Sequence, residues 1–365
     1  VTKCSANALE TILDWIQINQ TFSPGGRMRE RVVLVTGANG EVGHGLITYL
    51  GERGDVRIVA LDIQALGDEI KPYCYRTIQG DILDSMLLGR LVTDYQIETI
   101  YHLASVLSTS AEYNPEAAHR VNVEGTLNLL HLALEQSNWQ QRSIKFLYPS
   151  SIAIYGLGDL DTKAAAGRVG EDQFNRPITM YGCNKLYCEH LGRYYAHHYQ
   201  QLAVEHGSCL IDFRSLRFPG LISASTVPTG GTSDYGPEML HHAAKGEPYA
   251  CFVQPAAQLP FMAMPDAVKA LVDLEAVPAE RLTRQVYNVT SFSLTARQFL
   301  DYVLEAFPGA SIRFESDPKR EAIVNSWPAD LNDDAARQDW GWRPDFDVDR
   351  AFKEYLIPTI GGRYS

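Results

Sequence analysis

Residues 32–43 decide the fold, and they read Val32-Val33-Leu34-Val35-Thr36-Gly37-Ala38-Asn39-Gly40-Glu41-Val42-Gly43. The apolar run at the start predicts a strand that is buried on both faces. Three glycines follow at the spacing G-x-x-G-x-x-G, and residues 41–53 read as a helix. The glycines permit a tight turn, close backbone approach to a pyrophosphate and close packing of helix on strand, while the helix N-terminus attracts phosphate. This stretch therefore predicts a loop that binds a dinucleotide.

Strands and helices alternate from this loop to residue 217. Short apolar runs predict further buried strands, and apolar residues at helical spacing predict the helices between them. The expected strands are 56–61, 99–102, 144–149 and 211–217, and the expected helices are 84–95, 117–136 and 181–204. Crossovers of this length join parallel strands. We therefore expect an α/β fold with a Rossmann-type, doubly wound parallel sheet.

Beyond residue 217 the alternation breaks down. Residues 218–257 are rich in Gly and Pro, which predicts loops and short elements, and helical periodicity returns at 265–274 and 295–306. We expect three parts along the chain. They are an N-terminal extension (1–30), a dinucleotide-binding domain (31–217, with a return segment near 258–292) and a smaller C-terminal substrate-binding domain (218–257 and 293–365).

Composition excludes several classes of function. The 365 residues include 32 Lys+Arg and 44 Asp+Glu, a net charge of −12, which disfavours nucleic-acid binding. No run of apolar residues is long enough to predict a membrane span. The six cysteines form no C-x-x-C pair and predict free thiols in a reducing compartment, so we expect a cytoplasmic protein. Residues 1–30 lack the pattern of a signal or transit peptide.

Two acidic residues extend the expected dinucleotide site. Asp62 ends the second predicted strand, where its carboxylate can accept hydrogen bonds from an adenosine ribose and repel a 2′-phosphate. No Arg directly follows it, which favours NAD over NADP. Asp81, after a probable third strand, is a candidate to lie near the adenine amino group.

The chemistry is expected from Tyr181, Lys185 and Ser151. Tyr181 and Lys185 form a Y-x-x-x-K motif at the start of a predicted helix, so both side chains lie on one helical face. The Lys cation and an oxidised nicotinamide both favour the phenolate, which lets Tyr181 act as a base. Ser151 follows a buried strand, at the sheet edge where ligands bind, and can hold the substrate oxygen.

Together with His102-Leu103-Ala104 and Asn122, these motifs resemble those of the extended short-chain dehydrogenase/reductases over roughly residues 31–217. The resemblance implies NAD as cofactor and a homodimer formed through the helices that start near Ala117 and Tyr181. It implies that NAD is bound by Gly37, Asn39, Gly40, Glu41, Val42, Gly43, Asp62, Asp81, Ile82, Leu103, Ala104, Asn122, Tyr181 and Lys185.

The second half of the chain is more specific. Its motifs are similar to those of the short-chain type of L-threonine 3-dehydrogenases over most of residues 31–355, and they include Pro228–Tyr235, Leu259–Ala267, Tyr287–Thr290 and Ser326-Trp327-Pro328. This likeness implies NAD-dependent oxidation of the C3 hydroxyl of L-threonine, or a close 2-amino-3-hydroxy acid, to 2-amino-3-ketobutyrate. It implies a substrate site lined by Ser108, Ser151, Tyr181, Gly231 and Thr232, with Trp327 as a wall.

Two other functions stay open. A sugar-nucleotide epimerase or dehydratase of the same family would usually carry Asn and Tyr-Gly-Pro directly after the strand that ends near Arg217, whereas this chain has Phe218-Pro219-Gly220 there. A non-catalytic NAD-binding regulator would not need the Tyr, Lys and Ser set. We expect no metal site, because His190, His197 and His198 lack i, i+4 spacing, and we expect Arg217 to be ion-paired.

Overall fold

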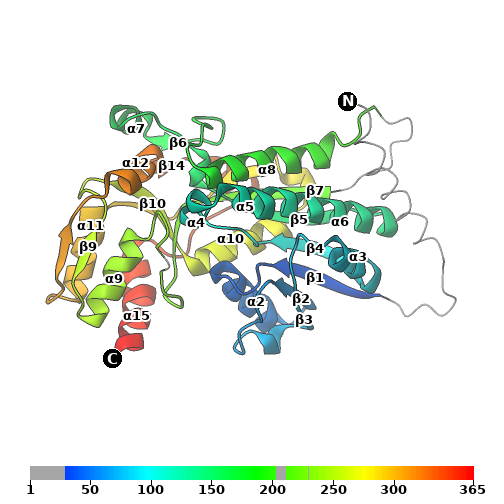
Figure 1. The fold of residues 1–365 in the computed structure, drawn as a ribbon, viewed down its shortest axis with the longest axis horizontal. Helices are drawn as coiled ribbons and strands as arrows, with labels where there is room; N and C mark the ends of the chain where they lie inside the picture. Colours follow the sequence, from blue (N-terminus) through cyan, green and yellow to red (C-terminus); the bar gives the residue numbers. More distant parts are fainter. Residues whose placement is uncertain (1–28, 203–210, 229) are drawn as a thin grey trace. The chain divides into compact units, whose positions relative to one another are not determined.

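The computed structural model describes residues 29–202, 211–228 and 230–365, and Arg31–Ser365 form one compact unit. The expected extension over residues 1–30 lies almost wholly outside the described residues. A seven-stranded sheet forms the centre of the unit, in the order β11-β7-β5-β4-β1-β2-β3 (Figure 1). Its strands in chain order are β1 (Glu30–Thr36), β2 (Ile58–Asp62), β3 (Arg76–Gln79), β4 (Tyr95–His102), β5 (Ile144–Ser151), β7 (Ile211–Phe218) and β11 (Val286–Asn288).

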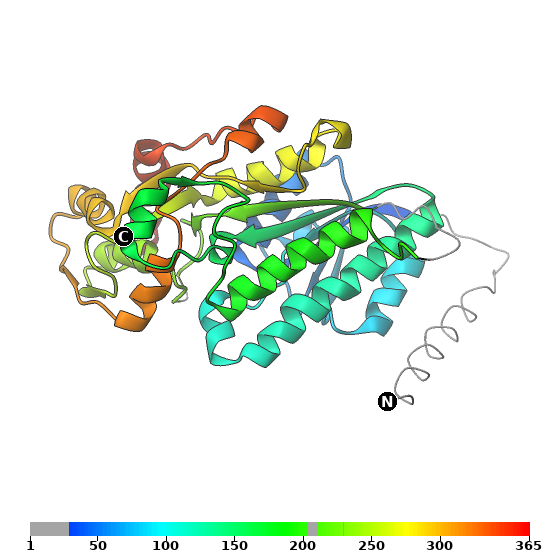
Figure 2. The ribbon, with the colours of Figure 1, turned by 90° about the horizontal axis from the view of Figure 1, so that it is seen from above.

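Helices cover both faces of this sheet. One face packs against α2 (Glu41–Arg53) and α10 (Met264–Ala276) through apolar side chains that include Leu46 and Leu271. The other face packs against α3 (Ser85–Asp94), α6 (Gly125–Gln140) and α8 (Met180–His197), and Figure 2 shows α6 and α8 side by side on it. The parallel pairings and the two helical layers confirm the doubly wound α/β fold.

The strand order predicts a crevice beside β1. The chain runs outward from β1 to β3 and then returns to β4 on the other side of β1, so the carboxyl ends of β1 and β4 are neighbours at the point where the order reverses. Gly37 follows β1 with φ +68°, and a Cβ there would lie 2.4 Å from the backbone nitrogen of Ala104. In sheets of this type ligands bind at this switch point.

A second lobe is built from short elements around its own apolar core. Three small sheets pair β12-β10-β8, β13-β9 and β14-β6. The strands are β6 (Arg168–Val169), β8 (Gly220–Ile222), β9 (Tyr249–Cys251), β10 (Gln258–Ala263), β12 (Phe292–Thr295), β13 (Ile312–Phe314) and β14 (Asp330–Leu331). The helices include α7 (Leu160–Ala166), α9 (Tyr235–Lys245), α11 (Ala296–Ala306), α12 (Pro318–Ser326) and α15 (Ile357–Tyr364). This core also takes in Ile152 and Tyr155, so the lobe packs against the chain that follows β5.

Three expected elements differ in the structure. The helix expected over 117–136 is α5 (Pro115–His119), a π-helical turn (Arg120–Glu124) and α6, because one extra residue per turn interrupts the regular ladder. The helix expected to end at 204 ends at His197. The region expected as loops contains the 11-residue helix α9, in which Pro237 falls in the first turn, where its missing N–H costs nothing.

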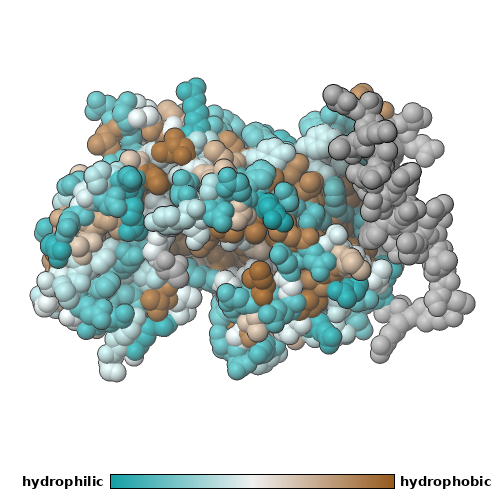
Figure 3. All heavy atoms as spheres, viewed as in Figure 1, coloured by the Kyte–Doolittle hydropathy of each residue, from teal (hydrophilic) through white to brown (hydrophobic). Residues whose placement is uncertain are grey.

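The surface is largely polar. The face drawn in Figure 3 is mostly hydrophilic, and its hydrophobic side chains show mainly across the middle. Large aromatic side chains are exposed on the outer helical layer, with Tyr187 and Tyr194 on α8 and Trp139 on α6. Among the described residues, no helix combines the length and the apolarity that crossing a bilayer requires.

Candidate active site

The glycine loop between β1 and α2 has the shape that a pyrophosphate requires. A Cβ at Gly43 would lie 2.5 Å from the carbonyl oxygen of Ala38, so helix and loop approach more closely than any side chain permits. Gly40 is the N-cap of α2, and no side chain caps the first N–H groups of the helix. These donors and the positive end of the helix dipole therefore face the crevice without a partner side chain.

Asp62 links this loop to the end of β2. Its Oδ2 accepts a hydrogen bond from the backbone N–H of Asn39 at 2.9 Å, and its Oδ1 accepts one from Gln64 N at 2.9 Å. The Asn39 side chain in turn accepts from Gly67 N at 3.1 Å. The carboxylate thus holds the glycine loop in place and lies at the strand end where a ribose is expected.

Other predicted cofactor residues surround this crevice. Leu103 donates its N–H to Thr36 O at 3.0 Å, which joins the ends of β4 and β1 beside Ala104. Asp81 accepts from Leu83 N at 2.9 Å, and Ile82 is buried under α6. Val42 is partly buried against the core beneath α2, and the Glu41 carboxylate accepts a hydrogen bond from Thr226 of the second lobe.

Asn122 holds the loop that follows β4. Its side-chain oxygen accepts from Val106 N at 2.7 Å and from Ser105 Oγ at 3.1 Å, and its amide donates to Val106 O at 3.0 Å. The side chain is buried in the π-helical turn. Asn122 therefore fixes the path of the chain toward Ser108 through its side chain.

Ser151, Tyr181 and Lys185 come together between β5 and α8. Ser151 ends β5, and its hydroxyl hydrogen-bonds the Tyr181 phenol and accepts from Ala153 N at 3.2 Å. The Lys185 ammonium group lies 5.4 Å from the centre of the Tyr181 ring and donates to Pro149 O at 2.7 Å. The three predicted catalytic side chains thus form one cluster at the carboxyl edge of the sheet.

Burial dominates the electrostatics of this cluster. It raises the pKa of Tyr181 well above that of a free phenol, while the Ser151 hydrogen bond acts in the opposite direction. Burial also lowers the pKa of Lys185 to about 8, and nearby Cys188 and Glu189 oppose that shift. Burial and the Ser151 hydrogen bond thus act on the pKa of Tyr181 in opposite directions, and a positive charge close to the ring would favour the phenolate.

Gly182 lets α8 approach the end of β5. A Cβ at this position would lie 2.0 Å from the carbonyl oxygen of Ala153 and 2.9 Å from Pro177 Cβ. Thr179 caps the helix by accepting from Gly182 N at 3.1 Å. The sequence analysis did not single out this glycine, although its place beside Tyr181 in the Y-x-x-x-K motif was visible.

Ser108, Gly231 and Thr232 also lie together. Thr232 donates its hydroxyl to Ser108 Oγ at 3.1 Å, which joins the 230–234 turn to α4 (Ser108–Tyr113). Gly231 N donates to Asp234 at 2.6 Å, and Gly231 O accepts from the Arg320 guanidinium at 3.2 Å. Trp327 is buried in the core of the second lobe, and its indole N–H has no partner among the described residues.

A buried ion pair is linked to the catalytic cluster through Ser150, the residue before Ser151. Arg217 on β7 donates to Glu189 on α8 through Nε at 2.9 Å and through a terminal nitrogen at 2.7 Å, and both side chains are at most 3% exposed. Ser150, next to Ser151, donates to the same carboxylate at 2.5 Å. The expectation that Arg217 is ion-paired is confirmed.

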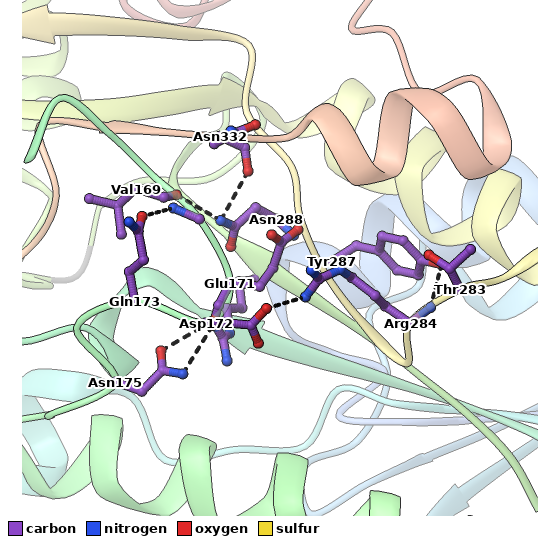
Figure 4. Close-up of polar contacts among 12 residues, drawn as sticks. Val169, Glu171, Asp172, Gln173, Asn175, Thr283, Arg284, Tyr287, Asn288 and Asn332 are labelled. Carbon is purple, nitrogen blue, oxygen red and sulfur yellow. Dashed lines mark hydrogen bonds and ion pairs between the residues drawn. The ribbon is translucent and has the colours of Figure 1, made fainter.

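A cavity of about 610 Å³ opens on the far side of this pair, at the β7–β11 edge of the sheet. Glu189 and Arg217 both line it, and the opposite wall comes from residues 171–175 and 279–286. Figure 4 shows that wall, where Asp172 and Arg284 point toward each other and pair at 2.7 Å. Asn288 joins the same wall to Val169 and Asn332.

Known proteins resemble this chain over most of its length. The family model described as "NAD dependent epimerase/dehydratase family" matches residues 33–290, which include the glycine loop, Ser151 and the Tyr181–Lys185 motif. This chain belongs to that family. Its description agrees with a nicotinamide cofactor at the glycine loop.

Several members of the family share most of the chain. The mitochondrial L-threonine 3-dehydrogenase of Bos taurus is 32% identical over 332 residues, which cover 90% of this chain and 82% of that protein. A monomeric L-threonine 3-dehydrogenase from a metagenome is 33% identical with a TM-score of 0.80, over 92% of this chain and 100% of that one. The L-threonine 3-dehydrogenase of Trypanosoma brucei is 33% identical with a TM-score of 0.79, over 92% and 99%.

Proposed function

We propose that this member of the epimerase/dehydratase family oxidises the C3 hydroxyl of L-threonine, with NAD as the acceptor, to 2-amino-3-ketobutyrate. The observation that carries the proposal is the cluster of Ser151, Tyr181 and Lys185 in a chain that also has a dinucleotide-shaped loop and the small polar group of Ser108 and Thr232. The threonine dehydrogenases that resemble this chain over its length support the substrate.

Each catalytic residue has its own role in the proposed reaction. Tyr181, as phenolate, takes the proton of the C3 hydroxyl, and Ser151 donates a hydrogen bond that orients the same oxygen. Lys185 places a positive charge near the phenol and helps to stabilise the phenolate. When bound, NAD would supply the hydride acceptor for C3, so that the products would be the ketone and NADH, and the proton would stay on Tyr181.

The donor set of the chain fits NAD. The uncapped N-terminus of α2 and the space kept open at Gly37 and Gly43 suit the pyrophosphate. Asp62 suits an adenosine ribose with a free 2′-hydroxyl and repels a 2′-phosphate. Asp81, Ile82, Leu103, Ala104 and Asn122 would complete the cofactor site, together with Asn39, Gly40, Glu41, Val42, Tyr181 and Lys185.

The polar group around Ser108 suits a small zwitterion. Short hydroxyl side chains and the backbone of Gly231 can hydrogen-bond a carboxylate and an ammonium group in little space. We propose that Ser108, Ser151, Tyr181, Gly231 and Thr232 contact the substrate and that Trp327 forms a wall. In this assignment residues 31–217 and 258–292 form the cofactor domain and 218–257 and 293–365 form the substrate domain, while Ser108, Ser151 and Tyr181 of the cofactor domain also face the substrate. Of the first set, α7, β6 and β10 pack in the second lobe.

A substrate panel tests the proposal. The purified full-length chain is assayed with L-threonine, L-serine and UDP-glucose, each with NAD and with NADP, and the absorbance of NADH or NADPH is followed. Accumulation of NADH with L-threonine supports the proposal. Conversion of UDP-glucose without release of NADH, and no reaction with L-threonine, would instead establish an epimerase or dehydratase.

We also propose a homodimer in the cytoplasm. Tyr187 and Tyr194 of α8 and Trp139 of α6 are exposed on the same helical layer. Aromatic side chains are enriched in protein interfaces. One similar threonine dehydrogenase is described as monomeric. Light scattering during gel filtration separates the two states, and a mass of one chain at micromolar concentration contradicts the dimer.

A further inference from the structure

The end of β5 and the start of α8 are joined at four consecutive strand residues. The ring of Tyr148 lies 4.6 Å from Lys185 Nζ, Pro149 O accepts from the same ammonium, Ser150 donates to Glu189 and Ser151 bonds Tyr181. The helix residues are 181, 185 and 189, four apart, so they form one row on the buried face of α8. Two members of the row are catalytic candidates, and the third, Glu189, has had no role so far.

Glu189 is unusually well held for a carboxylate. It is 1% exposed and receives three hydrogen bonds, two of them from Arg217. Arg217 is itself fixed by Tyr155 OH at 3.0 Å and by Glu171 O at 2.6 Å. Two buried charges are costly to keep unless their geometry serves a purpose. A hydrophobic pair of similar size would join β7 to α8 at a lower desolvation cost.

The groups around Lys185 indicate a purpose for the buried Glu189–Arg217 pair. The groups facing it are Tyr148 on β5, His102 on β4, and Tyr181, Cys188 and Glu189 on α8. Burial favours the neutral amine, whereas the nearby Glu189 carboxylate favours the ammonium form. Other polar contacts to α8 lie elsewhere: Glu112 accepts from Met180 N, and His131 bonds Tyr195. The remaining titratable side chains of α5 and the π-helical turn are exposed, and they are Glu116, His119, Arg120 and Glu124. On α6, Glu135 is partly buried, and burial raises its pKa to about 7.

We propose that Glu189, held by Arg217, is a positioning residue of the active site: it anchors Ser150 beside Ser151 and supplies the negative charge that balances the Lys185 ammonium group. This inference rests on the proposed function for its kinetic readout. It assigns the buried pair a task in catalysis in addition to joining β7 and α8.

The first test is Glu189→Gln, which keeps the shape and removes the charge. We expect kcat to fall by about 10- to 100-fold, the range for losing one charge-assisted hydrogen bond, with KM for L-threonine nearly unchanged. Because Lys185 should lose its proton at lower pH in this variant, the loss of kcat on the alkaline side of the pH profile should begin at lower pH. Glu189→Asp, which keeps the carboxylate, should restore the native pH profile. The matched control is Asp212→Asn, which breaks the buried Arg214–Asp212 pair at the other end of β7.

The cavity beside the pair allows a second, independent test. Glu189→Ala leaves Arg217 facing a cavity of about 610 Å³, through which a small carboxylate can enter. Acetate should then restore activity to Glu189→Ala in a saturable manner, whereas chloride at the same ionic strength should not. The double variant Glu189→Ala/Arg217→Met removes both buried charges, which protects folding, and it should not respond to acetate.

One measurement does not depend on the substrate. In protein labelled with 15N at lysine Nζ, the signal lost in Lys185→Arg identifies Lys185, and its titration midpoint should be lower in Glu189→Gln than in the native chain. An unchanged midpoint together with an unchanged pH profile overturns the inference. A shifted midpoint in a protein that does not oxidise L-threonine would keep the inference and reject the proposed substrate.

Discussion

Replacing Gly182 by Ala probes how closely α8 must approach β5. The added Cβ would lie 2.0 Å from Ala153 O, whereas a carbon and an oxygen atom normally stay about 3.3 Å apart. Helix and turn must therefore separate by about 1 Å at the place where Tyr181 meets Ser151. A misplacement of about 1 Å at a reacting group can cost about 100-fold in rate. We therefore expect kcat to fall about 100-fold.

The free energy of unfolding should also fall in this variant. Overpacking costs about 1–3 kcal/mol, and the higher helix propensity of Ala returns up to about 1 kcal/mol. The assays are NADH formation with L-threonine and thermal unfolding. Gly362→Ala in α15 is the matched control, since no atom lies within 4 Å of its added Cβ, and it should keep full activity. A Gly182→Ala enzyme with native kcat would refute the close-approach argument.

Three further outcomes are expected. Tyr181→Phe should lower kcat by about 100- to 10,000-fold, the usual contribution of a general base, and calorimetry should show that the variant still binds NAD. Asp62→Asn should weaken NAD binding by about 10- to 100-fold and improve NADP relative to NAD, which parallel titrations of both cofactors measure. Burial lowers the pKa of His102 to about 3 from its ordinary value of 6.5, so the native state resists protonation. Unfolding free energy should fall as pH drops from 6.5 toward 3, by up to roughly 1.4 kcal/mol per pH unit, and should do so less in His102→Asn.

The part of the site that lies close together in the sequence could be predicted. The glycine loop is a strand, a turn and a helix in direct succession, so its geometry follows from residues 32–43 alone, and α2 begins and ends where the periodicity predicts. Tyr181 and Lys185 are one helical turn apart. Ser151 was found because the end of a parallel strand has a known position relative to the next helix.

Contacts between distant segments were not accessible in the same way. Nothing in the sequence pairs Glu189 with Arg217, 28 residues away, although the four-residue step from Lys185 to Glu189 was a usable signal. Likewise, a Gly within a helix is read from the sequence only as a residue of low helix propensity. That Gly182 is needed for the close approach of Ala153 O could be learned only from the structure. The π-helical turn around Asn122 is set by tertiary packing and has no clear local signature.

The common row of Tyr181, Lys185 and Glu189 restricts how this protein can diversify. Loss or gain of one residue between Tyr181 and Glu189 would rotate everything beyond it around the helix axis by about 100°, so the links to β5 could no longer all form together. The short strands and turns of the second lobe contain no comparable row of linked catalytic side chains. Natural or laboratory evolution of substrate choice is therefore expected to proceed by exchanging or resizing those turns, with the β5–α8 unit inherited intact.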